Sequence, residues 1–405
     1  MAEFLINSIG LPQWLAWTIT AGVAAALILN VIAGGALVFI WAERKIAARI
    51  QDRLGPTRTG GRFGWLQSLA DGIKLLAKED LMPDGADGLL FRVAPYVSFC
   101  ASFCAFIALP FAFDFVGLRL NVAVFFVIAV LGLEVFGVIL AGYASASKWS
   151  LFGAMREAAQ VVSYEVPLGM CVVVPVMLAG TMDLVTIAEK QAGWFTSWYL
   201  FHDPFTFVIF WVYVTCAVAS VNRAPFDLAE AESELVAGFH TEYSGLRWSY
   251  FFMAEYGSMF LVSALAAVLF MGGWNGPIPV ASLLGVSEGT GDTAGYFVRL
   301  IGMVNLLGKA TLGVLVMMWI RWTLPRLRID QVMTTCLKYC TPIAAVMFAG
   351  AMLWQLALPG GLIGGLSRPA AEVREGWLQG PGGRTVPTGR AAAVDEANLV
   401  HAEGR

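Results

Sequence analysis

The sequence predicts an all-α protein that crosses a membrane eight times, and three observations lead to this prediction. Hydrophobic residues make up 58% of the 405 residues, charged residues make up only 14%, and the mean hydropathy is +0.70. This composition is typical of polytopic membrane proteins. Eight apolar runs are each about 20 residues long, which is the length that an α-helix needs to cross the hydrocarbon core. Finally, basic residues concentrate in alternate connecting segments.

The eight predicted spans divide the chain into a membrane domain over residues 1–359 and a tail over 360–405. The first apolar run follows a start without a basic region, so it predicts a span and not a signal peptide. From residue 360 onward Gly, Arg, Ala and Pro replace most large apolar residues, which favours a flexible external tail. The predicted spans lie near residues 20–42, 93–114, 122–144, 156–180, 205–222, 249–272, 297–320 and 336–358.

The distribution of positive charge predicts the orientation of the spans. Nine Lys and Arg residues lie between the first two spans, and the odd-numbered connecting segments together hold 17 of the 26. The even-numbered segments hold only Arg119, Lys190 and Arg299. Cytoplasmic segments are enriched in Lys and Arg. We therefore expect the odd-numbered segments to face the cytoplasm and both termini to lie outside.

The first cytoplasmic segment carries an amphipathic pattern. Leu66, Leu69, Ile73 and Leu76 recur at helical spacing, which predicts a helix over about 62–78 that lies at the membrane surface. Docking to that surface alone would explain this helix. The triplet Glu43-Arg44-Lys45 ends the first span, where charged residues usually serve as an interfacial anchor.

The cytoplasmic segment over 223–248 is strongly acidic. Asp227, Glu230 and Glu234 are spaced i, i+3, i+7, which predicts one shared helical face, with Glu232 off that face. A capping box after the preceding proline is the alternative explanation for the first two acids. Carboxylates this close raise one another's pKa values, which suits proton exchange near neutral pH. Two further acids continue the series, namely Glu242 and Glu255.

Charged residues also stand inside the predicted spans, where each costs roughly 2.5–3.5 kcal/mol on insertion scales. Glu134 is central in the third span and Lys309 is central in the seventh, so we hypothesise one polar axis across the bundle. The alternative is a single buried ion pair between them. Glu157 and Glu165 lie on similar faces of the fourth span and indicate a proton path, although solvation at the helix end would explain Glu157 alone.

The sequence argues against a cofactor site in this chain. The six cysteines include no Cys-x-x-Cys pair and the three histidines avoid the middle of the spans, so we expect no iron–sulfur, zinc, haem or other metal site. Neither a P-loop nor a strand followed by Gly-x-Gly-x-x-Gly is present, and a net charge of −3 does not suggest nucleic acid. A free-standing secondary ion transporter would show an inverted repeat. The acids instead crowd into one segment, and we identify no catalytic residue as such.

These residues together resemble one family of complex I (the proton-translocating NADH:quinone oxidoreductase), that of the H-designated membrane subunit beside the quinone chamber. The resemblance covers roughly residues 15–358. Gly60-Gly61-Arg62 departs from the family, which usually has Gly-Pro there. Four blocks carry the match: Glu43-Arg44-Lys45 with Gln51-Asp52-Arg53-Leu54-Gly55-Pro56; residues 66–76 with Lys78-Glu79; Arg156 to Gln160 with Ser163-Tyr164-Glu165; and Asn222-Arg223-Ala224-Pro225-Phe226-Asp227 through Tyr243, continued by Met253-Ala254-Glu255-Tyr256.

The resemblance implies roles for several of these residues. Family members form the membrane-side wall of a quinone tunnel, whose entrance is framed by the first span, the amphipathic helix and the sixth span. The positions that match the tunnel are Arg44, Arg53, Asp71, Arg223, Phe226 and Asp227. The positions that match an acidic funnel, thought to link quinone reduction to proton translocation, are Glu165, Glu230, Glu232, Glu234, Glu242 and Glu255.

The resemblance also implies a substrate and partners. Quinone is the substrate, and the iron–sulfur clusters and flavin belong to partner subunits. The expected partners are the peripheral quinone-reducing and iron–sulfur subunits on the cytoplasmic side, antiporter-like and small membrane-arm subunits, and the lipid of a bacterial inner membrane. The related subunit of a membrane-bound hydrogenase-type complex is the alternative, and the tunnel-side residues favour the quinone enzyme.

Overall fold

The computed structural model describes residues 12–113, 115–278 and 293–357, and their regular structure is helical apart from one isolated bridge between Ala112 and Phe115. The all-α polytopic prediction is thereby confirmed. The predicted tail over 360–405 lies outside the described residues, so the division into two domains stays a prediction.

Within the described residues, seven helical segments are long and apolar enough to cross a membrane. The fifth predicted span, 205–222, corresponds to α8, Pro204–Ser220, which has 17 residues and is shorter than the seven segments, so the count of eight stays a prediction. The seven segments are α2 (Gln13–Ile50), α4 (Gly88–Ala105, continued to Ala108), α5 (Ala123–Ala144), α6 (Lys148–Ala179), α10 (Gly245–Phe270), α12 (Thr293–Thr323) and α13 (Ile329–Met333) joined through a π-helical turn to α14 (Thr341–Ala357).

Short polar side chains cap the N-terminal ends of several helices. Asp87 accepts hydrogen bonds from the backbone N–H groups of Leu89 and Leu90 at the start of α4. Asp203 does the same for the Thr206 N–H at the start of α8, with Pro204 at the first helical position. These carboxylates satisfy N–H groups that lack a partner within the helix, so the sequence defines these starts locally.

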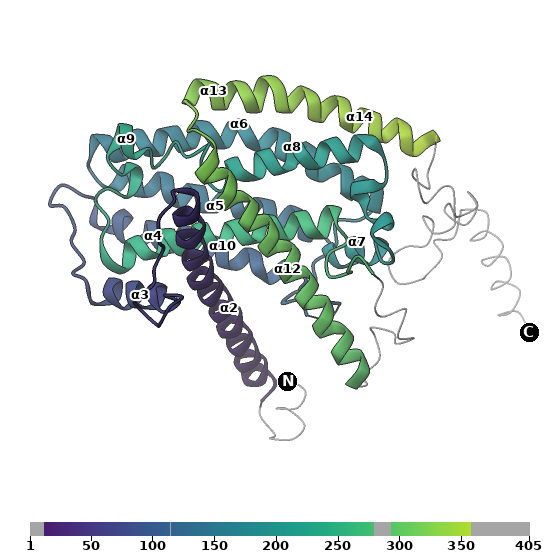
Figure 1. Cartoon of the computed structure of the whole chain (residues 1–405), viewed down its shortest axis with the longest axis horizontal. Coiled ribbons are helices and arrows are strands. Elements are labelled where there is room, and N and C mark those ends of the chain that lie inside the picture. Colours follow the sequence, from purple (N-terminus) through teal and green to yellow (C-terminus); the bar gives the residue numbers. More distant parts are fainter. Residues whose placement is uncertain (1–11, 114, 279–292, 358–405) are drawn as a thin grey trace, which may run out of the picture.

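The helix α10 forms the centre of the bundle. It packs against α4, α12, α2 and α8, and it is the most deeply buried of the spanning helices. Figure 1 shows α4, α5, α6, α8 and α10 running alongside one another, while α2 and α12 cross them obliquely. Glycine at 257 lets α4 approach α10, because a Cβ atom there would lie 2.8 Å from the Ser102 hydroxyl.

The helix α2 is longer than its predicted span. It has 38 residues, which correspond to about 57 Å, whereas the hydrocarbon core is about 30 Å thick. Its second half buries Ile32, Ala36 and Phe39 in the core, whereas Trp14 and Trp17 near its start are exposed. Hydropathy located the apolar part of the helix, but the polar turn that continues to Ile50 is also helical.

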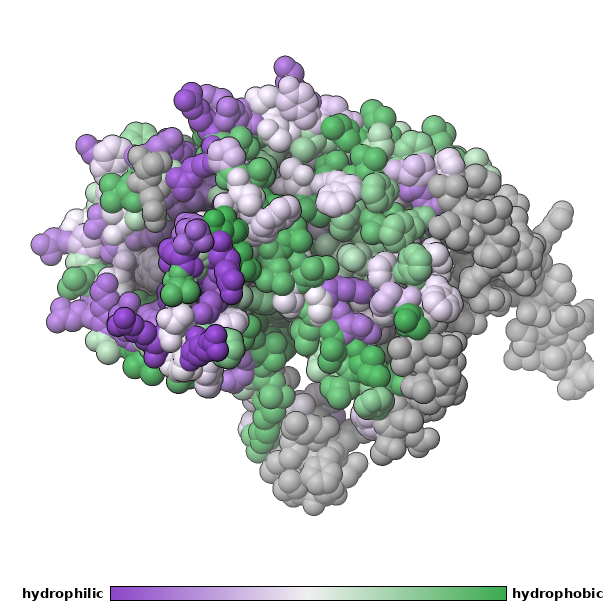
Figure 2. Space-filling view, viewed as in Figure 1, coloured by the Kyte–Doolittle hydropathy of each residue, from purple (hydrophilic) through white to green (hydrophobic). Residues whose placement is uncertain are grey.

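The amphipathic helix is confirmed, but it is shorter than predicted. It is α3, Gln67–Ala77, and turns occupy the residues before it, where Gly60, Gly61 and Gly64 have positive φ. The apolar side chains Leu69, Ile73 and Leu76 are exposed on its surface. Figure 2 shows hydrophilic residues gathered over the end of the molecule that carries α3, with hydrophobic residues over the middle of the bundle.

The acidic segment is not the helix that its spacing predicted. Residues 223–231 are irregular, and before α10 the segment has only two short helical pieces, α9 (Glu232–Leu235) and a 3-10 turn (Gly238–His240). The prediction that Asp227, Glu230 and Glu234 share one helical face is therefore wrong, and so is the alternative prediction of a capping box. The physical reason is that Asp227 and Glu234 pair with arginines of other segments, Arg326 and Arg156, whereas Glu230 contacts His240 ten residues further along the same segment. These contacts replace local helical neighbours.

Candidate functional site: a buried network of acids

Glu43 of α2 is the centre of a buried charge cluster. Its side chain is only 6% exposed, and it accepts hydrogen bonds from Arg223, from Arg321 of α12 and from the Tyr256 hydroxyl of α10. The Nη1 atom of Arg223 lies 3.4 Å from Glu43 Oε1. The interfacial-anchor explanation is therefore wrong for Glu43, because its carboxylate points into the protein toward two guanidinium groups.

Arg223 joins this cluster to a second acid. Its Nε lies 2.6 Å from Oε1 of Glu255, and its guanidinium carbon lies 4.6 Å from the centre of the Tyr256 ring. Burial acts to lower the pKa of Arg223, but the carboxylates of Glu255 and Glu43 outweigh burial and hold it well above its ordinary value. Arg223 is therefore a fixed positive charge between two acids.

The acids of the loop before α10 contact different partners around this cluster. Asp227 Oδ2 lies 2.6 Å from Arg326 Nη2, and its other carboxylate oxygen is buried without a hydrogen-bond partner. Glu234 Oε2 lies 2.6 Å from Nη1 of Arg156. Phe226, beside Asp227, is buried in the hydrophobic core. Glu242 is half-buried, and the side chain of Glu232 lies outside what the structure describes.

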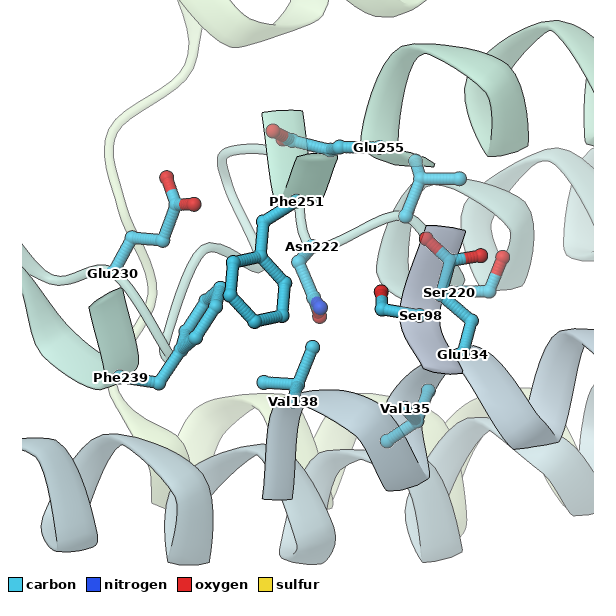
Figure 3. A pocket seen from close by; sticks show the side chains of 11 residues that line it. Ser98, Glu134, Val135, Val138, Ser220, Asn222, Glu230, Phe239, Phe251 and Glu255 are labelled. Carbon is cyan, nitrogen blue, oxygen red and sulfur yellow. The ribbon is translucent and has the colours of Figure 1, made fainter. Parts of the chain in front are cut away.

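Three carboxylates from different elements surround one small cavity of about 30 Å³. They belong to Glu134 of α5, Glu255 of α10 and Glu230 of the loop, and Figure 3 shows them around the Asn222 side chain. About 10–15 Å³ of cavity volume on this measure is enough to hold one water molecule. A polar cavity of this kind is able to hold water that bridges the three acids.

Glu157 extends the network into α6. It is fully buried, its Oε1 accepts from Asn222 Nδ2 at 2.8 Å, and its Oε2 has no hydrogen-bond partner. Gln160 in turn donates to Asn222 Oδ1 at 3.0 Å. Solvation at the helix end is therefore the wrong explanation for Glu157, because this carboxylate faces the same Asn222 that lines the cavity.

Two of the residues predicted to belong to the proton path, Glu165 and Lys309, lie apart from the network. Glu165 of α6 is exposed on the surface of the bundle. Lys309 Nζ donates to the backbone carbonyls of Met271, Gly273 and Asn275 at 2.5, 2.9 and 2.5 Å. Its ammonium group also lies 4.4 Å from the centre of the Trp198 ring.

Glu134 and Lys309 do not form the alternative buried ion pair. Glu134 is hydrogen-bonded to Ser258 in the middle of α10, whereas Lys309 contacts Met271 at the end of that helix. Met271, the residue that follows α10, is 13 positions after Ser258, which corresponds to about 20 Å of helix. Each buried group instead finds its own polar partners nearby.

The residues assigned to the tunnel entrance form a separate contact. Arg44, near the C-terminal end of α2, pairs with Asp71 of α3, and this pair joins the two elements. Arg53 is exposed and donates to Gln51 Oε1 at 2.7 Å. These residues therefore lie at the surface beside α3, whereas Arg223, Phe226 and Asp227 are buried.

His240 is a titratable group of the site that the sequence pattern did not single out. Its Nδ1 lies 3.5 Å from Glu230 Oε1, and its ring contacts Phe239 and Trp248 edge to face. Burial lowers the pKa of His240 from 6.5 to about 4. Because the folded-state pKa is the lower one, neutral His240 contributes stability that is fully present above pH 6.5 and is lost as pH falls toward 4.

We expect this loop to lose about 2 kcal/mol of stability between pH 7 and pH 5 through His240 alone. A His240→Gln variant carries no such titration, so its loss of thermal stability over this range should be smaller. The measurement is thermal unfolding of the purified protein complex at both pH values. The half-buried His202 provides the matched control, and an equal gain in His202→Gln would contradict this assignment to His240.

Sequence reasoning did not find Glu43, Tyr256, Arg321, Arg326 or His240 as members of the network. Arg321 and Arg326 counted only as positive charges that orient the spans. A useful signal was the presence of arginines and single acids, such as Glu43, at the ends of apolar runs. Which arginine meets which acid depends on helix packing, and no local spacing records it.

Comparison with known proteins identifies the family of the chain. Residues 23–352 match the family model described as NADH dehydrogenase. The relatives include the H-designated subunit of NADH-quinone oxidoreductase from Chlorobium luteolum, 46% identical over 83% of this chain and 90% of the relative. The same subunit of Anaeromyxobacter dehalogenans is 41% identical over 89% of both chains, and that of a Geobacillus species is 42% identical over 88% of this chain and 99% of the relative. The chain therefore belongs to the family of this membrane subunit of NADH-quinone oxidoreductase, or complex I.

Proposed function

We propose that this chain forms the membrane side of a quinone tunnel and couples quinone reduction to proton translocation through its buried acids. The observation that carries the proposal is the cavity between Glu134, Glu230 and Glu255, because Glu255 also pairs with Arg223. One fixed cation thus contacts the same acid that borders a cavity of water size. A change of charge near Arg223 therefore acts directly on the acids around the cavity.

The proposed quinone end of the route lies at Arg223, Phe226 and Asp227, and Arg44, Arg53 and Asp71 lie at its entrance. Reduction of a quinone to a quinol takes up two electrons and two protons. An unprotonated, reduced quinone oxygen beside Arg223 would compete with Glu255 and Glu43 for the guanidinium. At an effective dielectric of 20, a unit charge 7 Å away changes the energy of an acid by about 2 kcal/mol. That change moves a protonation equilibrium more than tenfold.

The proposed proton route runs from the loop acids to the cavity and then into the bundle. Asp227, Glu230, Glu232, Glu234 and Glu242 supply the cytoplasmic end. The cavity connects Glu230 and Glu255 to Glu134, and Asn222 connects it to Glu157. Glu165, exposed on α6, would then face a neighbouring membrane subunit.

In this proposal Lys309 does not carry protons. Its three carbonyl acceptors each stabilise the charged ammonium form, and none of them offers a proton in return. We therefore place Lys309 outside the route, as a cation that holds the segment Met271–Asn275 against α12.

The orientation and the partners belong to the same proposal. The positive-inside pattern supports a bacterial inner membrane location with both termini outside and with the loops before α4 and α10 in the cytoplasm. These loops would contact the peripheral subunits that carry the flavin and iron–sulfur clusters and deliver electrons to quinone. Antiporter-like and small membrane-arm subunits would adjoin the remaining surface of the bundle.

Affinity purification of this chain from native membranes in mild detergent tests the proposal. We expect the eluate to contain iron–sulfur subunits and to reduce quinone with NADH in a reaction that a quinone-site inhibitor blocks. Partners that oxidise hydrogen but not NADH would support the hydrogenase-type alternative. A chain recovered without redox partners would support the transporter alternative.

A further inference from the structure

Glu134 begins a chain of hydroxyl groups that leads away from the cavity. The Ser258 hydroxyl lies within hydrogen-bonding distance of both Glu134 and the Ser102 hydroxyl, the latter at 3.2 Å. Ser102 Oγ lies 3.2 Å from the carbonyl oxygen of Ala254, the residue before Glu255. Both serines are only 2% exposed, so water does not replace these contacts.

Each hydroxyl carries one proton, so the chain has two consistent arrangements. When Glu134 is ionised, Ser258 donates to the carboxylate and accepts from Ser102. When Glu134 is protonated, the acid donates to Ser258, which donates to Ser102, which donates to the Ala254 carbonyl. The direction of the hydrogen bonds between these side chains therefore reverses with the protonation of Glu134.

We propose that Ser258 and Ser102 form a two-state hydroxyl relay that allows Glu134 to gain and lose a proton without leaving a buried polar group unsatisfied. This proposal rests on the proposed role of Glu134 in proton translocation. Ser258 is a positioning residue for that step, since it accepts from the acid and donates to the carboxylate. The relay ends at the α10 backbone immediately before Glu255, the acid that pairs with Arg223.

The contrast with Glu43 shows why a hydroxyl suits this position. Glu43 accepts from two guanidinium groups, which only donate and so stabilise the carboxylate alone. Glu134 instead has a neutral partner that serves either protonation state. Among these acids, the geometry assigns a fixed charge to Glu43 and an exchangeable proton to Glu134.

Close packing of α4 against α5 and α10 brings the groups of the relay together. Glycine at 257 leaves room for Ser102, since a Cβ atom there would lie 2.8 Å from its hydroxyl. Glycine at 137 brings α5 onto α4, since a Cβ atom there would lie 2.7 Å from the Ser98 backbone nitrogen. Figure 3 shows Ser98 beside Glu134 at the cavity, so the acid lies between the cavity and the relay.

Infrared spectroscopy of the assembled complex tests the relay directly. The C=O stretch of protonated Glu134 is identified as the band that Glu134→Gln removes from difference spectra between acid and alkaline pH. We expect Ser258→Ala to shift this band to higher wavenumber, because the acid loses its acceptor. Ser102→Ala should give a smaller shift in the same direction, because it weakens only the next hydrogen bond of the chain.

Two further variants complete the experiment. Ser258→Thr keeps the hydroxyl and should return the band toward its wild-type position. Ser263→Ala is the matched control, since Ser263 is a buried serine of the same helix that donates to its own backbone at Met259. A band that Ser258→Ala leaves in place, or that Ser263→Ala moves equally, would overturn the relay, and so would Glu134→Gln spectra without a lost band.

The outcome for the relay is distinguishable from that of the proposed function. If Glu134→Gln leaves proton pumping unchanged while Ser258→Ala still shifts the band, the relay stands and the role of Glu134 in translocation fails. If the relay operates in translocation, Ser258→Ala should lower the number of protons pumped per electron, and Ser258→Thr should restore it.

Discussion

Replacing Glu43 with glutamine is expected to remove most assembled, quinone-reducing complex from the membrane. The carboxylate of Glu43 is the shared acceptor for Arg223 and Arg321. When it becomes an amide, Arg321 loses its carboxylate partner and Arg223 keeps only Glu255. Leaving one partner of a buried ion pair uncompensated costs about 3 to 5 kcal/mol. The amount of complex in native gels and its NADH:quinone reductase activity measure the effect.

Two matched variants show whether the loss comes from the buried cations. Glu79→Gln removes an exposed acid on the same side of the protein and should retain both assembly and activity. Combining Glu43→Gln with Arg321→Gln removes the cation that loses its carboxylate partner, so the double variant should lose less than the sum of the two single variants. Strict additivity would contradict the assignment of Glu43 as the centre of the cluster.

Glu134→Gln is expected to separate the two halves of the reaction. An amide is similar in shape to the protonated acid and bonds to Ser258, so the helices should stay packed and electron transfer to quinone should continue. The amide does not exchange a proton, so proton pumping in proteoliposomes should be lost. A pH-sensitive dye, read together with NADH oxidation, gives the number of protons per electron.

The same Glu79→Gln variant serves as the control, with pumping and reductase activity both retained. Pumping by Glu134→Gln at the wild-type ratio would show that this carboxylate carries no proton in the cycle. Loss of reductase activity together with pumping would instead indicate a structural role, because the quinone end of the network would have been disturbed.

Hydropathy predicted the helical bundle well because burying apolar side chains in lipid is a local property of each run. It also singled out Glu134 and Glu157, since an acid inside an apolar run stands out wherever its helix packs. The ends of α2 and α6 were less predictable because their polar terminal turns are helical without being apolar.

Pairing within the site could not be predicted because it depends on how distant helices meet. The spacing of Asp227, Glu230 and Glu234 favoured a helix, yet contacts with Arg326, His240 and Arg156 determine their positions. Lys309 was central in its apolar run, but its contacts are carbonyls at the end of α10 and not an acid in the middle of the bundle. Long-range partners of this kind leave no periodic trace in the sequence.

The buried charge cluster centred on Glu43 also constrains how the protein inserts and folds during its synthesis. Glu43 belongs to the first spanning helix, whereas Arg321 lies 278 residues further along the chain. At ribosomal rates of about 5–20 residues per second, roughly 14–55 s pass between the synthesis of the two partners. For most of that interval the carboxylate lacks its full set of arginines, so the nascent helix must keep it near water at the membrane surface. Final burial of this part of α2 is therefore a late step of biogenesis that waits for α12.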